Sequence, residues 1–461
     1  MSLATLADLV LREPALAASM RDARSGLATL DLTGPAALRP FVVKGLVDAG
    51  RTVLVVAATV REAEDLTEEL QDLMDPASVA LYPAWETLPH ERLSPRSDTV
   101  GRRLAVLRRI KHPGTEANNG PLKVIVAPVR SVLQPQVKGL ADLEPVELAP
   151  GQEVELEDVV RRLAGAAYSR VDLVEKRGEF AVRGGIVDVF PPTEEHPVRV
   201  EFFGDEIDEI RAFAVADQRT LEPVERLWAP PCRELLLTDD VRRRAAELGE
   251  QHPQLAELTD KLAQGMAVEG MESLSPALVD EMEMLVDLLP PETHVLVLDP
   301  ERVRTRAHDL VATSDEFLGA SWAAAASGGT APIDLGAASL RGIGEVRTQV
   351  LEQGQGWWGI SPFGIETDQT LAEIDPGAAE SRAIAAQPAD AYRGDIEAVI
   401  TDIRAHLAGG RSVVTIHQGH GPAQRMVEVL GEHDVPARLV ETVGATEATD
   451  GLVLVTQGCL A

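Results

Sequence analysis

Residues 168–210 read YSRVDLVEKRGEFAVRGGIVDVFPPTEEHPVRVEFFGDEIDEI and decide how the middle of this chain folds. Three short apolar-rich runs lie there, at Glu179–Val182, Ile186–Phe190 and Val198–Phe203. The pair Gly184-Gly185 separates the first two runs, and Pro191-Pro192 ends the second. Short, nearly alternating runs between glycine and proline turns are typical of antiparallel strands. The segment therefore predicts a small antiparallel sheet.

Strand and helix patterns alternate on both sides of this segment. The apolar run Thr52–Ala58 predicts a buried parallel strand, and the amphipathic pattern Val60–Leu73 predicts the helix after it. Further strand patterns occur at Val79–Tyr82, Val124–Ala127 and His294–Leu298. Alternating strands and helices predict an α/β domain with a parallel sheet. The simplest arrangement is that a small α+β domain, built from the quoted segment, interrupts this α/β domain.

The last part of the chain starts a new cycle of strand and helix patterns. A helical pattern at Ile396–Leu407 is followed by a strand pattern at Ser412–Ile416, and two further strand patterns end near Val455. We expect a small α/β domain here, and a truncated one, because the chain stops soon after its last strand pattern. With 461 residues the chain is too long for a single core. The predicted units are 1–135 and 231–372 for the interrupted parallel-sheet domain, 136–230 for the inserted domain, 373–392 for a linker and 393–461 for the small α/β domain.

The chain is strongly acidic. Asp and Glu number 74 against 43 Lys and Arg, which gives a net charge of −31. Because DNA-binding proteins neutralise phosphates with Lys and Arg, this charge disfavours tight DNA binding by this chain alone. It favours a partner with a basic face, or it simply reflects a solvated acidic surface, and the composition leaves both open.

The sequence carries no signal for a membrane or a secretory route. No apolar run is long enough for a transmembrane helix, and the first residues lack the basic start and apolar core of a signal peptide. Cys232 and Cys459 are far apart in sequence, and nothing supports their pairing. We therefore expect a cytoplasmic protein without a membrane partner.

Arg170, Arg177 and Arg183 lie among the predicted strands of the small sheet, with Phe190 close by. Arginine and aromatic residues are favoured at the centres of protein interfaces, so this sheet is a candidate docking face. The alternative is that these arginines form ion pairs with the many nearby carboxylates. Phe190 can also be a core residue before the two prolines, and we favour that interpretation slightly.

Two weaker patterns remain. A basic cluster follows one face of the helical pattern Val100–Ile110, which predicts a solvated helix face rather than a phosphate contact. Its members are Arg102, Arg103, Arg108, Arg109 and Lys111. His417 and His420 follow a strand pattern, but no Cys or carboxylate stands at metal spacing, so we predict no metal site.

The turn after the first predicted strand is where an ATPase of this architecture would place its phosphate loop. Such a loop needs G-x-x-x-x-G-K-[ST], because backbone amides and the lysine bind phosphates and the hydroxyl binds magnesium. Here the turn begins Thr33-Gly34, and the second glycine, the lysine and the hydroxyl are replaced by Ala36, Ala37 and Leu38. We therefore expect a degenerate loop, no nucleotide cofactor and no catalytic residue in this chain.

The sequence RGEFAVRGGIVDVFPP (residues 177–192), followed by VRVEFFGDEIDEI (198–210), resembles the second domain of UvrB and the matching domain of transcription-repair coupling factors. Both families use this domain to bind UvrA. The resemblance implies that this chain binds UvrA in the same way, with Arg183 in the matching Val-Arg-Gly motif. Arg170 matches an arginine of UvrB, whereas some coupling factors carry that arginine at the position of Ser169.

Other features resemble the coupling factors rather than UvrB. UvrB has an intact phosphate loop and an aromatic-rich hairpin that clamps DNA, whereas the stretch Trp85–Arg96 of this chain is short and almost without aromatics. The acidic motif of UvrB-like proteins is split here by Pro300, between Asp299 and Glu301. The resemblance therefore implies the N-terminal region of a coupling factor. Its helicase-like UvrB-type domains 1a, 2 and 1b would be followed by domain 3.

Membership of this family would imply a longer parent protein, an ATP-driven DNA translocase that pushes stalled RNA polymerase. ATP and magnesium would act in a C-terminal motor outside this chain, and the full-length protein would contact DNA and RNA polymerase. This region would recruit UvrA for transcription-coupled nucleotide excision repair and would restrain the motor. Two alternatives stay open: a divergent UvrB-like protein that binds nucleotide or DNA, and a purely structural regulatory region without UvrA contact.

Overall fold

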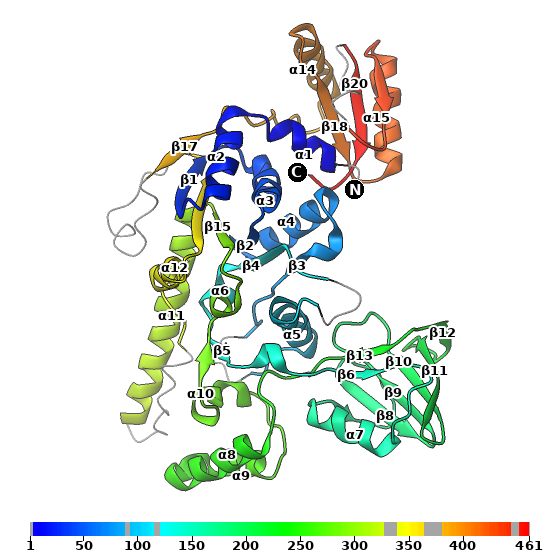
Figure 1. Ribbon diagram of the computed structural model, residues 1–461, viewed down its shortest axis with the longest axis vertical. Coiled ribbons are helices and arrows are strands. Elements are labelled where there is room, and N and C mark those ends of the chain that lie inside the picture. The colour runs from blue at the N-terminus through cyan, green and yellow to red at the C-terminus, as the bar shows by residue number, and fades with distance from the viewer. Residues whose placement is uncertain are drawn as a thin grey trace.

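The centre of the computed structural model is a seven-stranded parallel sheet (Figure 1). The structure describes residues 3–87, 93–114, 120–326, 339–363, 380–443 and 451–460. Across the sheet the strands follow the order β17 (Ser381–Ala383), β1 (Thr29–Thr33), β16 (Gly356–Ser361), β15 (Thr293–Leu298), β2 (Thr52–Ala57), β4 (Val124–Pro128) and β3 (Val79–Leu81). All pairings between these neighbours are parallel, which confirms the predicted α/β domain.

Both faces of this sheet are covered by helices, which explains why its central strands are apolar throughout. Side chains of β2 alternate between two apolar clusters: Leu54 and Val56 belong to one, Val53 and Val55 to the other. The first cluster includes residues of α5 (Ser97–Lys111), α6 (Val129–Leu133), α11 (Pro300–Ala326) and α12 (Ile343–Glu352). The second includes residues of α1 (Ala4–Val10), α2 (Pro14–Ser25), α3 (Arg39–Asp48) and α4 (Val60–Leu73).

A six-stranded sheet forms from residues inserted between β4 and β15. Its order is β12 (Thr220–Pro223), β11 (Glu206–Phe213), β10 (Val198–Phe203), β9 (Ile186–Val189), β8 (Glu179–Arg183) and β7 (Ser169–Arg170). The pairings are antiparallel except for the parallel pair β7–β8, so the predicted antiparallel sheet is confirmed. Helix α7 (Leu156–Gly165) covers one face, where Val159 and Leu163 share an apolar cluster with Phe180.

Short ladders lie near two of the predicted boundaries. The pair β6 (Val146–Leu148) and β13 (Leu227–Ala229) closes the inserted unit, but β5 (Gln136–Val137) pairs with β14 (Met282–Glu283), outside it. Residues 136–137, which were assigned to the inserted unit, therefore pair with a strand that follows this unit in the chain. Strand β17 lies in the predicted linker 373–392, of which residues 373–379 fall outside the described residues. The strands β5, β14 and β17 are short and carry no apolar run, so periodicity does not reveal them.

Two smaller units complete the chain. Helices α8 (Asp239–Gln251), α9 (Ala256–Ala263) and α10 (Ser275–Leu278) surround their own apolar cluster. The last unit is a parallel sheet in the order β18 (Val413–His417), β20 (Val453–Gln457) and β19 (Ala437–Leu439), with α14 (Ile396–Ala408) and α15 (His420–Glu432). These elements match the strand and helix patterns from which the small α/β domain was predicted. Short 3-10 helices occupy Ala36–Leu38, Pro76–Ser78, Leu140–Asp142, Pro253–Leu255, Met271–Leu274 and Leu285–Leu288.

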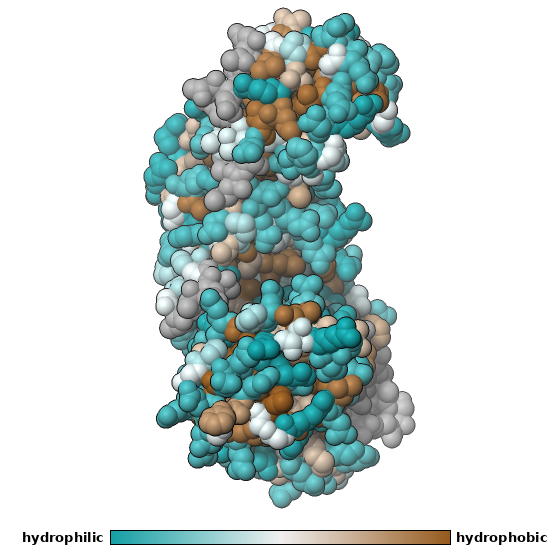
Figure 2. Space-filling model, turned by 90° about the vertical axis from the view of Figure 1, so that its right-hand side faces the viewer, coloured by the Kyte–Doolittle hydropathy of each residue, from teal (hydrophilic) through white to brown (hydrophobic). Residues whose placement is uncertain are grey.

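The surface is mainly hydrophilic on the face drawn in Figure 2. Among large apolar side chains of the described residues, Phe203 is 82% exposed and Phe363 is 78% exposed. The described part of the chain contains no helix with the length and apolar character needed to cross a membrane.

Candidate docking site on the inserted sheet

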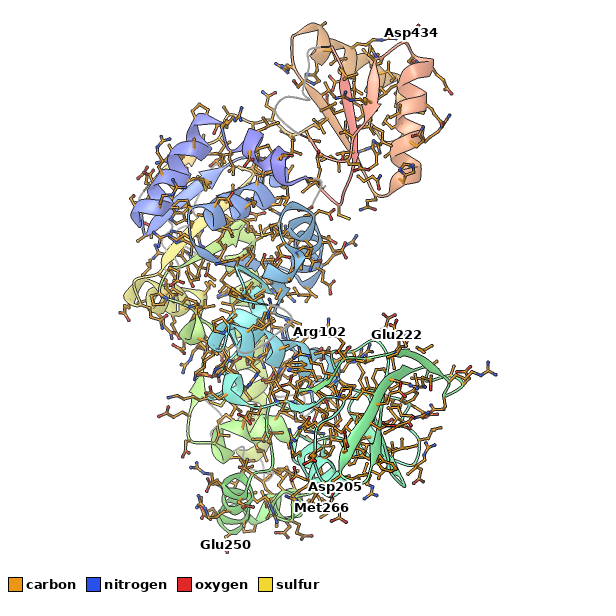
Figure 3. The ribbon with its side chains drawn as sticks, turned by 45° about the vertical axis from the view of Figure 1, so that its right-hand side comes forward. Arg102, Asp205, Glu222, Glu250, Met266 and Asp434 are labelled. Carbon is orange, nitrogen blue, oxygen red and sulfur yellow. The ribbon has the colours of Figure 1, made fainter. Side chains whose placement is uncertain are left out.

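The face of the six-stranded sheet that lies opposite α7 is partly open to solvent, and we call it the open face. Strand register places four of its side chains in one row across β8 to β11: Arg183, Ile186, Glu201 and Glu209. Their neighbours Val187 and Val200 point to the other face and pack in the cluster under α7. Asp205 and Glu222 mark opposite ends of the sheet (Figure 3). The row is mostly charged, which suits a face in contact with solvent rather than a core.

Arg183 lies at the end of β8, at the same end of the sheet as an exposed aromatic ring. Its side chain is exposed, and Nη2 donates a hydrogen bond to the carbonyl oxygen of Asp172 at 3.0 Å. The amide of Phe202 donates to the carbonyl oxygen of Gly185 at 2.8 Å, which brings the end of β10 next to the turn that follows Arg183. The next residue, Phe203, is 82% exposed. This end of the sheet therefore combines a cation with an apolar ring.

Arg177 lies before the opposite end of β8. Its Nε donates to the carbonyl oxygen of Glu194 at 3.0 Å, and its guanidinium lies 5.1 Å from the centroid of the Phe190 ring. Phe190 is 6% exposed and packs with Val174 and Phe213. Phe190 is therefore a core residue, as the favoured interpretation had it, and its ring is covered by Arg177. Direct contact of the Phe190 ring with a partner has no support in this arrangement.

Arg170 lies on the edge strand β7 and is exposed. It is in register with Phe180, whose side chain packs under α7, whereas Ser169 is in register with Glu179. Paired residues of neighbouring strands point to the same face, so Arg170 projects toward the α7 side of the sheet. The position of Ser169, not that of Arg170, shares the face of Arg183. The three predicted arginines therefore do not form one cluster.

The inserted unit rests on the first half of α5, the helix on which Arg102 is labelled in Figure 3. A Cβ at Gly101 would lie 2.4 Å from the Cβ of Pro192. The helix and the inserted unit therefore approach each other closely at Gly101, because glycine has no side chain. Ser97 Oγ donates to the carbonyl oxygen of Arg177 at 3.1 Å. The backbone around Arg177 thus belongs to the joint between the two units.

Arg103 connects α5 to the chain that returns from the inserted unit. Its side chain is fully buried; Nε lies 2.5 Å from Glu234 Oε1, and Nη1 donates to the carbonyl oxygen of Pro83 at 3.0 Å. The guanidinium also lies 4.4 Å from the centroid of the Tyr82 ring. Burial raises the pKa of Tyr82, so its phenol stays protonated.

The predicted solvated basic face is therefore wrong for Arg103, because the returning chain packs against this side of α5. The rest of the basic cluster also binds acceptors of this chain, either side-chain carboxylates or backbone carbonyl oxygens. These residues are Arg102, Arg108, Arg109 and Lys111.

The turn that corresponds to a phosphate loop is in contact with other groups of this chain. The amide of Gly34 donates a hydrogen bond to the carbonyl oxygen of Ser361 at 2.9 Å. The amide of Ile384 donates a hydrogen bond to the carbonyl oxygen of Thr33 at 2.8 Å. A Cβ at Gly34 would lie 3.0 Å from Leu38 Cδ1 and 3.3 Å from Ile384 Cδ1. The turn is thus covered by the apolar side chains of Leu38 and Ile384. It also lacks the glycine, lysine and hydroxyl of a phosphate loop, as the sequence shows.

The split acidic motif lies where α11 begins. Asp299 has a φ of 51°, and Pro300 is the first residue of the helix. The Oδ2 atom of Asp299 lies 3.9 Å from Arg302 Nη1, and Arg302 also pairs with Glu62 of α4. An arginine of the chain itself therefore faces the carboxylate of this motif.

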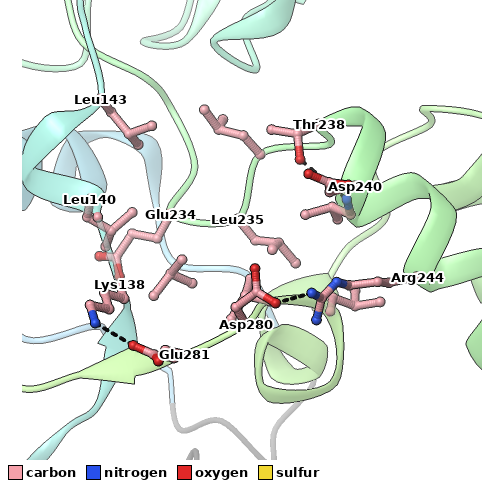
Figure 4. A pocket seen from close by; sticks show the side chains of 16 residues that line it. Lys138, Leu140, Leu143, Glu234, Leu235, Thr238, Asp240, Arg244, Asp280 and Glu281 are labelled. Carbon is pink, nitrogen blue, oxygen red and sulfur yellow. Dashed lines mark hydrogen bonds and ion pairs between the residues drawn. The ribbon is translucent and has the colours of Figure 1, made fainter.

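A cavity of about 370 Å³ lies between residues 137–143 and α8 (Figure 4). Much of its wall is apolar, and two ion pairs border it, Lys138–Glu281 and Arg244–Asp280. None of the residues predicted for docking lines it. Within the ranges that the structure describes, no three His, Cys, Asp or Glu side chains are grouped so as to hold a metal ion.

Comparison with known proteins identifies the inserted unit. A family model described as the UvrB interaction domain matches residues 146–235, which run from β6 to just beyond β13. The open face and Arg183 lie within this match.

The rest of the chain also has relatives. Transcription-repair-coupling factors of Mycobacterium bovis and Mycobacterium tuberculosis are 45% identical to it over 475 residues, which cover 99% of this chain and 37% of each relative. The coupling factor of Myxococcus xanthus is 35% identical over 295 residues, covering 59% of this chain and 24% of the relative. A solved helicase domain, that of Pyrococcus furiosus Hef, aligns over 97% of this chain and 86% of its own with 10% identity and a TM-score of 0.15, too low to support an argument.

A parallel-sheet domain that carries an inserted UvrB interaction domain defines a UvrB-like protein of DNA repair. Within this class, the chain belongs to the transcription-repair-coupling factor family and corresponds to the N-terminal, UvrB-like region of those proteins. It spans 37% of the length of the mycobacterial relatives.

Proposed function

We propose that this chain recruits UvrA to stalled RNA polymerase, as the UvrA-docking region of a transcription-repair coupling factor. The observation that carries this proposal is the position of Arg183, exposed on the open face inside the matched UvrB interaction domain. The acidic net charge of −31 is compatible with this role, because docking a protein does not require contact with DNA phosphates.

The docking contact is expected to combine charge with an apolar anchor. Arg183 uses Nη2 for the carbonyl oxygen of Asp172, and a guanidinium has five N–H donors, so several are left for a carboxylate of UvrA. Phe203 lies at the same end of the sheet and offers a large apolar surface. Interfaces commonly draw most of their binding energy from a few such arginine and aromatic residues.

Calorimetric titration of purified UvrA tests this directly. We expect the wild-type chain to bind, and Arg183→Ala to lose about 1–3 kcal/mol of binding free energy. The matched control is Arg161→Ala, which removes an exposed arginine from α7, on the other side of the sheet. The control should bind like wild type, and circular dichroism and Tm should be unchanged in both variants.

The outcomes separate the alternatives. Equal binding by wild type and Arg183→Ala would place the docking surface elsewhere on the chain. Absence of binding by the wild-type chain would favour a purely structural regulatory role without UvrA contact.

We also propose that this region restrains a C-terminal motor of the full-length protein. That motor would use ATP and magnesium, and the full-length protein would contact DNA and RNA polymerase. This chain itself would take no nucleotide, which is supported by the engaged amide of Gly34 and by the apolar cover from Leu38 and Ile384. Because these partners work on DNA and transcription, the protein would act in the cytoplasm.

A further inference from the structure

The polar network around Arg103 contains three buried side-chain atoms that have no hydrogen-bond partner among the described residues. These atoms are Gln134 Oε1, Gln136 Nε2 and Glu234 Oε2. Each of the three residues is only 2% exposed, so bulk water does not reach them. Buried polar atoms in folded proteins are nearly always paired, with protein or with ordered water. Each of these atoms therefore calls for a partner.

The other ends of two of these side chains are held, which fixes their orientation. Gln136 Oε1 accepts hydrogen bonds from the Tyr82 hydroxyl and from Arg103 Nη2, the latter at 3.3 Å. Glu234 Oε1 accepts from Arg103 Nε at 2.5 Å and from Trp85 Nε1 at 2.9 Å. Turning the Gln136 amide over would set its NH₂ group against the guanidinium of Arg103, which has only donors. Because the network binds Gln136 Oε1 and Glu234 Oε1, it leaves Gln136 Nε2 and Glu234 Oε2 without a partner.

The three residues line one small cavity, together with Trp85 and Met282. Its volume is about 10 Å³, close to the smallest space that holds one water molecule and too small for a larger ligand. The lining also includes Glu272 and Ser275, whose side chains are already hydrogen-bonded within the chain. The lining atoms without a partner are one donor and two acceptors. A metal ion would face the NH₂ of Gln136, and an anion would face the carboxylate of Glu234. A water molecule, with two donors and acceptor capacity, matches the set.

We propose that this cavity holds one ordered water molecule that donates to Gln134 Oε1 and Glu234 Oε2 and accepts from Gln136 Nε2. The water joins three parts of the chain: the segment that leads into β5, helix α5 through Arg103, and the chain that returns from the UvrB interaction domain at Glu234. It therefore helps to hold the root of the docking domain on the parallel-sheet domain.

A crystal structure of this chain, at a resolution that shows ordered water, is the first test. We expect one isolated density peak within hydrogen-bond distance of all three atoms. An empty cavity would overturn the proposal, and so would rotated glutamines that pair the three atoms with one another.

Thermal unfolding of Gln134→Met is the second test. Methionine has a similar length but no comparable acceptor, so it removes one of the three partners of the water and weakens the binding of a water that also serves Gln136 Nε2 and Glu234 Oε2. We expect a Tm about 2–4 °C below wild type, with faster amide exchange around Glu234. The control is Gln251→Met, at the exposed end of α8, which should leave Tm unchanged. A Tm equal to wild type for Gln134→Met would contradict a supporting role for the water.

Discussion

Two arginines of this chain show how burial decides the role of a residue. Arg103 has no exposed side-chain area and is paired with Glu234, whereas Arg183 is exposed and binds only a backbone oxygen in the described structure. Loss of one partner from a buried ion pair leaves an uncompensated charge and costs about 3–5 kcal/mol. Loss of an exposed arginine usually changes stability by less than about 0.5 kcal/mol. Arg183 can therefore be removed to test docking without unfolding the chain.

The pH dependence of stability should report the buried His294 of β15. It is 2% exposed, and burial, together with the charge of Arg51, lowers its pKa from 6.5 to about 4. Between these two values the unfolded chain binds a proton that the folded chain does not, so stability falls as the pH falls through this window. The full effect is about 3 kcal/mol. Below pH 4 both states are protonated, and this contribution to the pH dependence ends.

Urea unfolding of wild type and His294→Leu at pH 7 and near pH 4.5 measures this contribution. We expect wild type to lose more free energy of unfolding on acidification than the variant does. The same loss in both proteins would mean that His294 does not carry the effect.

At the scale of elements, the contact between α5 and the inserted unit depends on one glycine. Gly101→Ala would place a Cβ 2.4 Å from that of Pro192, and overpacking of this kind costs about 1–3 kcal/mol. We expect lower stability in urea and faster proteolysis near the joint. Gly165→Ala in the last turn of α7 is the control, because no atom lies within 4 Å of the added Cβ. A Gly101→Ala variant as stable as this control would show that the joint is loose.

Strand β17 and the residue after it make the turn at Gly34 part of the core. Ile384 is 6% exposed and covers that turn, and the sequence lacks the phosphate-binding lysine at Ala37. We therefore expect no measurable ATP hydrolysis by the purified chain in a phosphate-release assay. Turnover that disappears on substitution of Gly34 would refute this, whereas turnover that persists in such a variant would indicate a contaminating ATPase.

At the scale of the whole molecule, the net charge of −31 should dominate any encounter with DNA. The arginines and the lysine of the α5 cluster bind acceptors of the chain itself, which reduces their use for phosphates. We expect weak binding to duplex DNA that decreases steeply with salt, as measured by fluorescence anisotropy at low and at physiological ionic strength. A tight complex that survives physiological salt would contradict the charge argument.

Long, strongly patterned elements could be predicted from the sequence. The helix predicted at Val60–Leu73 has those bounds as α4, and β2 covers nearly all of the predicted Thr52–Ala58. The docking sheet was also predicted, but its exposed ring was not. The register of β10 and β11 shifts between Glu201 and Phe202, where Asp208 is the extra residue of β11. The alternation of β10 continues through this shift, because Val200 and Phe202 pack in the cluster under α7 and Phe203 is exposed. The alternation of Val198–Phe203 thus carried a signal for the exposed ring that the prediction did not use.

By itself, the sequence determined the order of strands and helices, the acidic character of the chain and the loss of phosphate-binding groups at Gly34 to Leu38. These are properties of neighbouring residues or of composition. Only the tertiary structure decided that Arg103 is buried, that Phe190 is a core residue and that β17 joins the large sheet. Each of these depends on residues far apart in the chain, such as Arg103 and Glu234, which are separated by 131 positions. Local patterns do not specify such contacts, because they form only when the elements pack together.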